Sequence, residues 1–267
     1  MLCKLECFFV LFLCECLKIY RLNRLLIILR FDIIIVEYIL LYYILFGSDL
    51  TASEAVIHFL ITIFVYMISL AVHEFFHGLT AFKMGDPTAK LAGRLTLNPF
   101  KHLDMMGFLM FIFLGVGWAK PVPVNPLNFK KFKKGTRVVS IAGVTANFVL
   151  GLVSAGIFAI LLSTVGVGGV AMGYVYNILM YFMLVNSFLV MFNILPFPPM
   201  DGYNFISSFL KPENSFLKFM TRSGYKVLIG FLIAGFVTDL FFGFDIFNVY
   251  LALLNDFVYW PIAWIGV

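Results

Sequence analysis

The sequence predicts an all-α polytopic membrane protein, and its composition, its long apolar runs and the placement of its basic residues all indicate this class. Of the 267 residues, 62% are hydrophobic and 12% are charged, and the mean hydropathy is +1.01. A soluble domain is roughly half apolar and about a quarter charged. This apolar excess cannot be buried in one water-soluble core, so lipid must cover much of the surface.

Several apolar runs are long enough to cross a bilayer, which takes about twenty residues in a helix. The strongest occupy 55–82, 138–164 and 172–196. A less regular run covers 25–46, and 226–265 has room for one or two further crossings. We therefore expect several transmembrane helices.

The apolar run at 105–118 has only 14 residues, which is short for a crossing. We expect it to dip into the membrane and to return on the same side. Non-helical backbone is tolerated at membrane depth only where protein or a water-filled cavity covers it. Such a re-entrant segment usually marks a functional region.

Basic residues alternate between the two sides of the predicted membrane. Ten lysines and arginines lie within 83–137, whereas the loops 47–54 and 165–171 have none. The positive-inside rule then places the N-terminus and residues 83–137 in the cytoplasm of a multi-pass cell-membrane protein. The basic run KKFKK at 130–134 is expected to contact anionic lipid headgroups, so we predict the lipid bilayer and no nucleic acid as a partner.

The chain divides into one membrane core with an extension on each side. We expect residues 1–54 to form a hydrophobic extension with a transmembrane helix, 55–210 the membrane core, and 211–267 a C-terminal transmembrane region. All four cysteines lie in the first sixteen residues, so no disulfide framework holds the core together. We interpret these cysteines as apolar residues of the first segment, with metal binding by Cys14 and Cys16 as the alternative.

The motif HEFFH at 73–77 indicates a metal site. Positions i and i+4 share a helix face, so His73 and His77 can bind one zinc ion through their imidazoles. Glu74 lies beside them as a candidate general base. Three ionisable residues within five positions of an apolar helix are costly unless a partner such as a metal offsets the penalty. The alternative interpretation is a polar cluster for helix packing or proton conduction.

A catalytic zinc ion usually has three protein ligands and a water. Asp201 is the candidate third ligand, because it follows the 172–196 helix in a segment that three prolines interrupt. An ordinary helix end with a surface Asp-Gly turn is the alternative. The predicted topology places Asp201 and the two histidines toward the same, cytoplasmic side of the membrane, which favours a shared site.

The chain resembles the site-2 protease family of intramembrane zinc metalloproteases. The resemblance covers roughly residues 55–205 and includes HEFFHG and the pattern Asn-x-x-Pro-x-Pro-x-x-Asp-Gly from Asn193 to Gly202. Further stretches resemble the compact bacterial and archaeal branch, without PDZ or CBS domains: GDPTAK at 85–90, GRLTLNP at 93–99, His102-Leu-Asp104 and GWAKPVPVNP at 117–126. The resemblance implies a three-helix catalytic core with flanking transmembrane helices and a small membrane-dipping β or re-entrant region at 85–126.

The resemblance also implies roles for individual residues. His73, His77 and Asp201 are expected to hold one Zn²⁺ per chain, and Glu74 to act as general base toward a water activated by the metal. Asn193 is expected to help bind the substrate backbone. Asn147 ends the segment AGVTAN at 142–147, in which Val144 replaces the family's proline. For Asn147, substrate binding and an interhelical hydrogen bond are equally favoured.

The expected activity is hydrolysis of peptide bonds in transmembrane or membrane-adjacent substrates near the cytoplasmic face. No regulatory module is recognised in the chain, so a separate regulatory membrane protein is a candidate partner; the oligomeric state stays open. Two other functions fit part of the pattern. A prenyl-protein-processing type of membrane protease also has HExxH but typically takes a glutamate as third ligand, and a non-enzymatic membrane protein can retain a structural metal.

Overall fold

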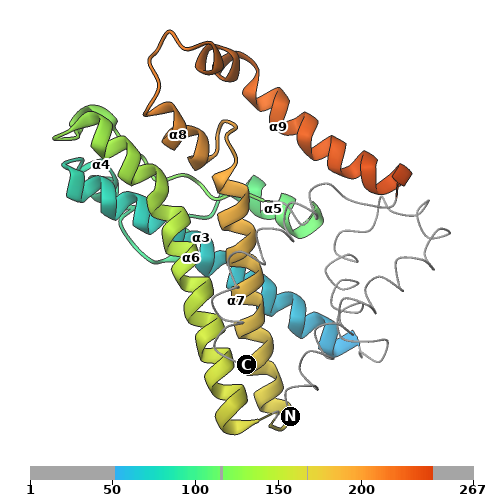
Figure 1. Cartoon of the computed structure of the whole chain (residues 1–267). Helices are drawn as coiled ribbons and strands as arrows, with labels where there is room; N and C mark the ends of the chain where they lie inside the picture. The colour runs from blue at the N-terminus through green and yellow to red at the C-terminus, as the bar shows by residue number, and fades with distance from the viewer. Residues whose placement is uncertain (1–51, 115–116, 167, 243–267) are drawn as a thin grey trace. The chain divides into compact units, whose positions relative to one another are not determined.

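The computed structural model describes residues 52–114, 117–166 and 168–242 (Figure 1). Four long helices dominate this part of the chain: α3 (Ala52–Met84), α6 (Phe132–Val165), α7 (Val170–Ile194) and α9 (Ser215–Phe242). The short elements are α4 (Thr88–Leu91), η2 (Pro99–Lys101), α5 (Met105–Leu114), η3 (Pro126–Asn128) and α8 (Asp201–Ser207). The predicted helix at 25–46, and the predicted helical region beyond 242, lie outside the described residues.

Three described helices are long and apolar enough to cross a membrane: Val56–Met84, Phe132–Val165 and Val170–Ile194. These are the three runs that the sequence marks most strongly. The prediction of an all-α membrane protein is therefore confirmed at this level. The fourth long helix, α9, begins at Ser215, eleven residues before the predicted apolar region at 226.

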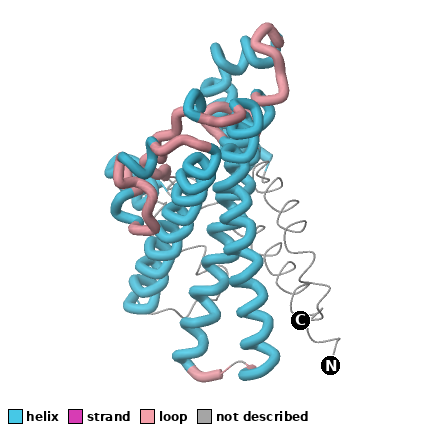
Figure 2. Tube along the Cα trace, turned by 90° about the vertical axis from the view of Figure 1, so that its left-hand side faces the viewer, coloured by secondary structure: helices cyan, strands magenta, loops and turns pink. Residues whose placement is uncertain are grey.

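The predicted β character of residues 85–126 is not confirmed, because no strand occurs among the described residues (Figure 2). A single isolated antiparallel bridge joins Leu103 to Ala119, and the Lys120 amide donates to the His102 carbonyl at 2.8 Å. Prolines explain why this pairing does not grow into a ladder. Pro121 and Pro123 follow directly and have no N–H to donate.

The described residues form two compact units, the first made of 52–64 and 104–118 and the second of 65–103 and 119–242. In the first unit, the Asp104 carboxylate caps α5 by accepting from the Gly107 amide at 2.8 Å. Helix α5 has ten residues and is therefore about 15 Å long. This is about half of a hydrocarbon core of about 30 Å, so α5 cannot cross a membrane.

In the second unit, α6 and α7 run side by side and antiparallel in both views (Figures 1 and 2). Their turn contains Gly166, whose positive φ of 73° favours glycine, and the Tyr176 hydroxyl donates to the Gly166 carbonyl at 2.5 Å. The buried face of α6 is rich in small residues, which let helix backbones approach closely without an apolar side-chain layer. They include Gly143, Ala146, Gly151, Ala155 and Ala159.

The chain reverses sharply between α7 and α8. Helix α7 ends at Ile194, two residues before Pro196, and the prediction of a proline-interrupted helix end is confirmed. A cluster of Leu195, Met200 and Leu228 packs this reversal against α9. Gly202 is needed for the close approach, because a Cβ there would lie 2.8 Å from the Leu195 carbonyl oxygen and closer still to that of Ile194. The reversal brings Asp201 back toward the end of α7.

Candidate metal centre

The centre begins with two histidines one turn apart on α3. His73 and His77 are buried, and their Nε2 atoms lie 3.0 Å apart. The rings meet edge to face with centroids 4.6 Å apart. This is the shared helix face that the HEFFH spacing predicts.

Asp201 joins them from the first turn of α8. Its Oδ2 lies 3.3 Å from His73 Nε2 and 3.0 Å from His77 Nε2. This oxygen is buried and has no hydrogen-bond donor within the described chain. The structure thus brings together three side chains that the sequence predicts as one set, although 124 residues separate His77 from Asp201.

The hydrogen-bond partners of the two Nδ1 atoms determine which ring nitrogens of His73 and His77 carry protons. His77 Nδ1 lies 2.8 Å from the Val139 carbonyl oxygen, and His73 Nδ1 lies 2.5 Å from the Asn147 side-chain oxygen. Both partners are acceptors, so each Nδ1 must carry the proton. In the neutral form of each ring, Nε2 then presents a lone pair toward the other ring and toward Asp201. Three acceptor atoms that face one another repel unless a cation, either a metal ion or a proton, lies between them.

The donor set and the available space both fit zinc. Zinc–ligand bonds of about 2.0–2.1 Å in a tetrahedron separate neighbouring ligand atoms by about 3.3 Å, and the observed separations of 3.0–3.3 Å are close to this. Gly143 of α6 lines the site with backbone alone. A Cβ at Gly143 would lie 2.7 Å from His73 Nδ1 and closer still to His77 Nε2. The site therefore needs glycine at this position.

Glu74 is half-buried, next to the histidines on α3. Its Oε2 accepts a hydrogen bond of 2.7 Å from the Val122 amide. This bond fixes one carboxylate oxygen and does not use the other. A carboxylate held beside a metal centre with one oxygen to spare can accept a proton there.

The two asparagines predicted for substrate binding differ in their surroundings. Asn147 is fully buried and contacts His73, Ser69 and Asn186. Asn193 is half-buried near the end of α7 and donates to the Leu189 carbonyl of its own helix at 2.9 Å. A substrate role stays a prediction for both residues.

Sequence reasoning did not find Asn186, Ser69 or Gly143. Asn186 and Ser69 are fully buried and lie within apolar helices, where polar side chains are unusual and need partners. That unusual placement is a signal that can be read in a sequence. Gly143 carries no comparable signal, because small residues are common along α6.

Asp86 holds the segment that contains Val122. Its buried carboxylate accepts from the amides of Asn125 at 2.7 Å and Thr88 at 3.1 Å, and from the Asn128 side chain at 2.8 Å. The Thr88 hydroxyl donates to it as well. Burial alone would raise the pKa of Asp86, but these hydrogen bonds outweigh burial and hold the pKa below its usual value. Asp86 therefore ties the end of α3 to residues 122–128, and through them to Glu74.

Comparison with known proteins finds relatives that are named as zinc metalloproteases. The chain is 39% identical over 149 residues to the protein named "Putative zinc metalloprotease YwhC" of Bacillus subtilis, a match that covers 55% of this chain and 67% of YwhC. It is 26% identical over 215 residues to "Putative zinc metalloprotease Rip2" of Mycolicibacterium smegmatis, covering 78% of this chain and 75% of Rip2. The Rip2 protein of Mycobacterium tuberculosis is 30% identical over 163 residues, covering 58% of this chain and 59% of Rip2.

No family profile matches the chain, and no solved structure matches it. The similarity to YwhC spans two thirds of that protein at 39% identity. On this evidence the chain belongs to the same family as these zinc metalloproteases, the site-2 protease family that its HEFFH and Asn193–Gly202 motifs resemble.

Proposed function

We propose that this protein is an intramembrane zinc endopeptidase that hydrolyses peptide bonds of transmembrane or membrane-adjacent substrates near the cytoplasmic face. One observation carries the proposal: three acceptor atoms, His73 Nε2, His77 Nε2 and Asp201 Oδ2, converge on one point with separations of 3.0–3.3 Å. One Zn²⁺ per chain at that point offsets their mutual repulsion.

Zinc, when bound, supplies a Lewis acid that acidifies water and polarises the scissile carbonyl. Glu74 accepts the proton of the attacking water on the carboxylate oxygen that Val122 does not fix. Glu74 then delivers this proton to the departing amine. The Val122 amide orients the carboxylate, and Asn193 at the end of α7 is proposed to bind the substrate backbone.

We assign α3, α6 and α7 as the three-helix core. Helix α3 supplies the two histidines, α6 supplies Gly143, which lines the site, and the reversal after α7 carries Asp201. The re-entrant proposal rests on two features of residues 103–119. Helix α5 is too short to cross a bilayer. The bridge between Leu103 and Ala119 holds the two ends of this segment next to each other. Both features support a segment that enters and leaves on one side.

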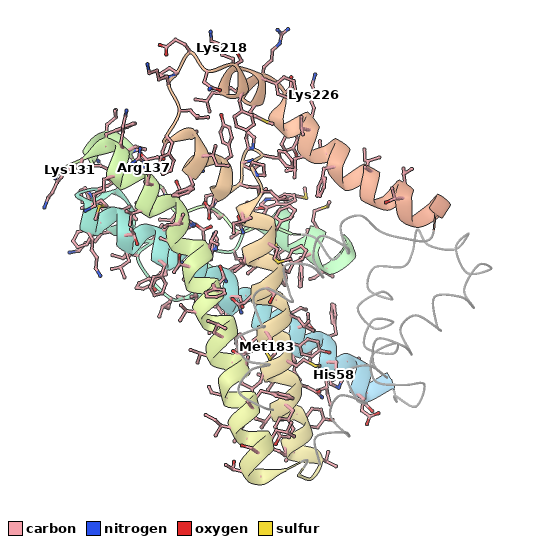
Figure 3. All side chains as sticks on the ribbon, in the orientation of Figure 1. His58, Lys131, Arg137, Met183, Lys218 and Lys226 are labelled. Carbon is pink, nitrogen blue, oxygen red and sulfur yellow. The ribbon has the colours of Figure 1, made fainter. Side chains whose placement is uncertain are left out.

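The orientation rests on the basic residues. The exposed lysines 130, 131, 133 and 134 flank the start of α6, and Lys131 points away from the helices in Figure 3. Cationic side chains favour the cytoplasmic leaflet. Access of substrates is proposed to depend on a separate regulatory membrane protein.

A prenyl-protein-processing protease is the rival enzyme, and the third ligand separates the two. That class typically uses glutamate, whereas in the described residues the group that completes the donor set is Asp201. A protein with a purely structural metal has no use for Glu74 beside the ligands.

The test compares wild type with Glu74→Gln. We expect the variant to keep its zinc, because Glu74 is not a proposed ligand, and to cleave a model transmembrane peptide about 10²–10⁴-fold more slowly. Zinc content by mass spectrometry and product formation in detergent give the two readouts. Undiminished cleavage by the purified variant contradicts the proposed mechanism, and a zinc-loaded wild type that cleaves none of several substrates supports the structural-metal alternative.

A further inference from the structure

Three fully buried polar residues connect the three core helices beneath the metal centre. Ser69 lies on α3, Asn147 on α6 and Asn186 on α7, and each has 0% of its surface exposed. Polar side chains between apolar helices need internal partners. Within the described chain, these three residues hydrogen-bond to one another, and Asn147 also contacts His73.

The Asn186 amide has a direction that a backbone carbonyl fixes. One end of it lies 2.8 Å from the Phe182 carbonyl oxygen, which can only accept, so this end is the Nδ2 donor. The same nitrogen donates to Ser69 Oγ at 2.9 Å. The other end, Oδ1, must therefore face Asn147.

This direction passes on to Asn147. Asn186 Oδ1 accepts from Asn147 Nδ2 at 2.6 Å, and the Ser69 carbonyl accepts from the same nitrogen at 3.2 Å. Asn147 consequently presents its oxygen to His73 Nδ1 at 2.5 Å. Two carbonyl oxygens, of Phe182 and Ser69, thus determine which way both amides point.

The direction of the Asn147 amide matters for His73. An oxygen facing Nδ1 requires the Nδ1–H tautomer and leaves Nε2 free to bind a metal. A turned amide would present its NH₂ group to Nδ1 and favour the Nε2–H tautomer. That tautomer places a proton where the metal is proposed to bind.

We propose that Asn186 is a positioning residue of the metal centre: by accepting from Asn147 Nδ2, it holds the Asn147 amide in the direction that keeps His73 Nε2 unprotonated. The side-chain hydrogen bonds of Asn186 run to Asn147, Ser69 and Phe182, so Asn186 acts on the centre through Asn147. The inference rests on the proposed function, in which His73 is a zinc ligand.

The experiment compares Asn186→Leu with Asn186→Asp in the full-length, detergent-purified protein. Leucine removes the shorter of the two acceptor contacts of Asn147 Nδ2 and leaves only the Ser69 carbonyl oxygen at 3.2 Å, so the Asn147 amide is held less firmly and can turn. A protonated aspartic acid keeps the acceptor for Asn147, because its carbonyl oxygen can accept from Asn147 Nδ2 while its hydroxyl donates to Phe182; only the donation to Ser69 Oγ is lost. Zinc affinity is measured by chelator competition, and the visible spectrum of the Co²⁺-substituted protein reports the ligand geometry.

We expect Asn186→Leu to weaken zinc binding about 10–100-fold and to alter the cobalt spectrum, while Asn186→Asp stays within a few-fold of wild type. Ser154→Ala is the matched control, since Ser154 is buried in α6 and donates only to the Leu150 carbonyl of its own helix. This control is expected to leave zinc affinity unchanged.

The double variant Asn147→Asp with Asn186→Leu separates positioning from packing. An ionised carboxylate at position 147 can only accept from His73 Nδ1, so it is expected to restore zinc binding without Asn186. Where Asn186→Leu does not fold, Asn186→Ala takes its place in both comparisons. Equal zinc affinity in Asn186→Leu and wild type overturns the inference, and so does a double variant that fails to recover zinc binding. If His73→Ala also binds zinc like wild type, the ligand assignment itself is wrong.

Discussion

At the residue scale, the centre depends on a position that has no side chain. Gly143 places the α6 backbone directly against the imidazoles of His73 and His77. Any larger residue must displace a ring or the helix, because protein interiors do not accommodate such overlap without strain. The space for the metal is therefore defined by α6 as much as by the ligands.

Gly143→Ala is expected to lower zinc affinity about tenfold or more, comparable with the loss of a group that orients a ligand. Gly156→Ala on the same helix is the matched control, because a Cβ at Gly156 meets nothing within 4 Å. Chelator competition measures both variants. If Gly143→Ala and Gly156→Ala bind zinc equally well, the close approach of α6 does not define the site.

The site was predictable to different extents from different residues. His73, Glu74 and His77 follow from a five-residue motif on one helix, whose geometry is local. Asp201 follows from the demand for a third ligand and from the family pattern. Asn186 and Gly143 act only where α3, α6 and α7 pack together. Which residues of neighbouring helices meet cannot be read from the sequence of one helix alone.

At the scale of elements, α8 carries Asp201 and α6 holds the other end of α8. The Arg137 guanidinium of α6 stacks on the Phe209 ring with 3.8 Å to its centroid, and its NH2 group lies 3.4 Å from the Ser208 carbonyl oxygen. Figure 3 shows Arg137 near the start of α6. This contact fixes the end of α8 away from the metal centre.

Arg137→Ala is expected to destabilise the protein by about 0.5–2 kcal/mol and to weaken zinc binding, because α8 can then move Asp201 away. Arg137→Lys is not expected to keep the full stability and zinc affinity of the wild type, since lysine lacks the planar group that stacks on Phe209. Thermal unfolding in detergent and zinc affinity are the measurements. The exposed Arg222 of α9 provides a control through Arg222→Ala, and an equal effect of the two alanine variants argues against the contact.

Asp86 gives a pH-dependent prediction for the junction between α3 and η3. Its pKa in the folded protein lies below the usual value of about 3.9. The ionised carboxylate therefore stabilises the folded protein fully at a pH above the usual pKa. This stabilisation is lost as the pH falls through the lower pKa that Asp86 has in the folded protein.

Asp86→Asn replaces one accepting oxygen by a donor that must face another donor. We expect a loss of about 1–3 kcal/mol at pH 7 and a difference from wild type that narrows as pH falls below about 4. Unfolding free energies between pH 3 and pH 7 test this. A difference that stays constant over this range shows that the charge of Asp86 does not contribute.

The helices could be predicted better than the connection between them. Apolar runs at 55–82, 138–164 and 172–196 reappear as α3, α6 and α7 with ends shifted by a few residues, because length and hydropathy are local properties. For 85–126 the family resemblance implied a small β or re-entrant region, yet Pro121 and Pro123 have no N–H group to donate to a ladder. Among the described residues of this region, only the isolated bridge between Leu103 and Ala119 forms.

At the scale of the whole molecule, the proposed function sets two requirements that the apolar composition makes hard to meet together. Water and a charged centre must be held among helices that lipid surrounds. The small residues of α6 and the reversal after α7 allow this, because they bring backbone and carboxylate close without long polar side chains. Proteolysis inside a membrane is the activity that we propose for such a centre.

The most direct test is the zinc content of the purified wild type and of Asp201→Ala after dialysis against a weak chelator. We expect one zinc ion per chain in the wild type and far less in the variant, because two imidazoles alone do not complete the donor set. Asp201→Ala with a full zinc ion per chain would show that His73 and His77 hold the metal without the distant carboxylate, and would contradict the central claim.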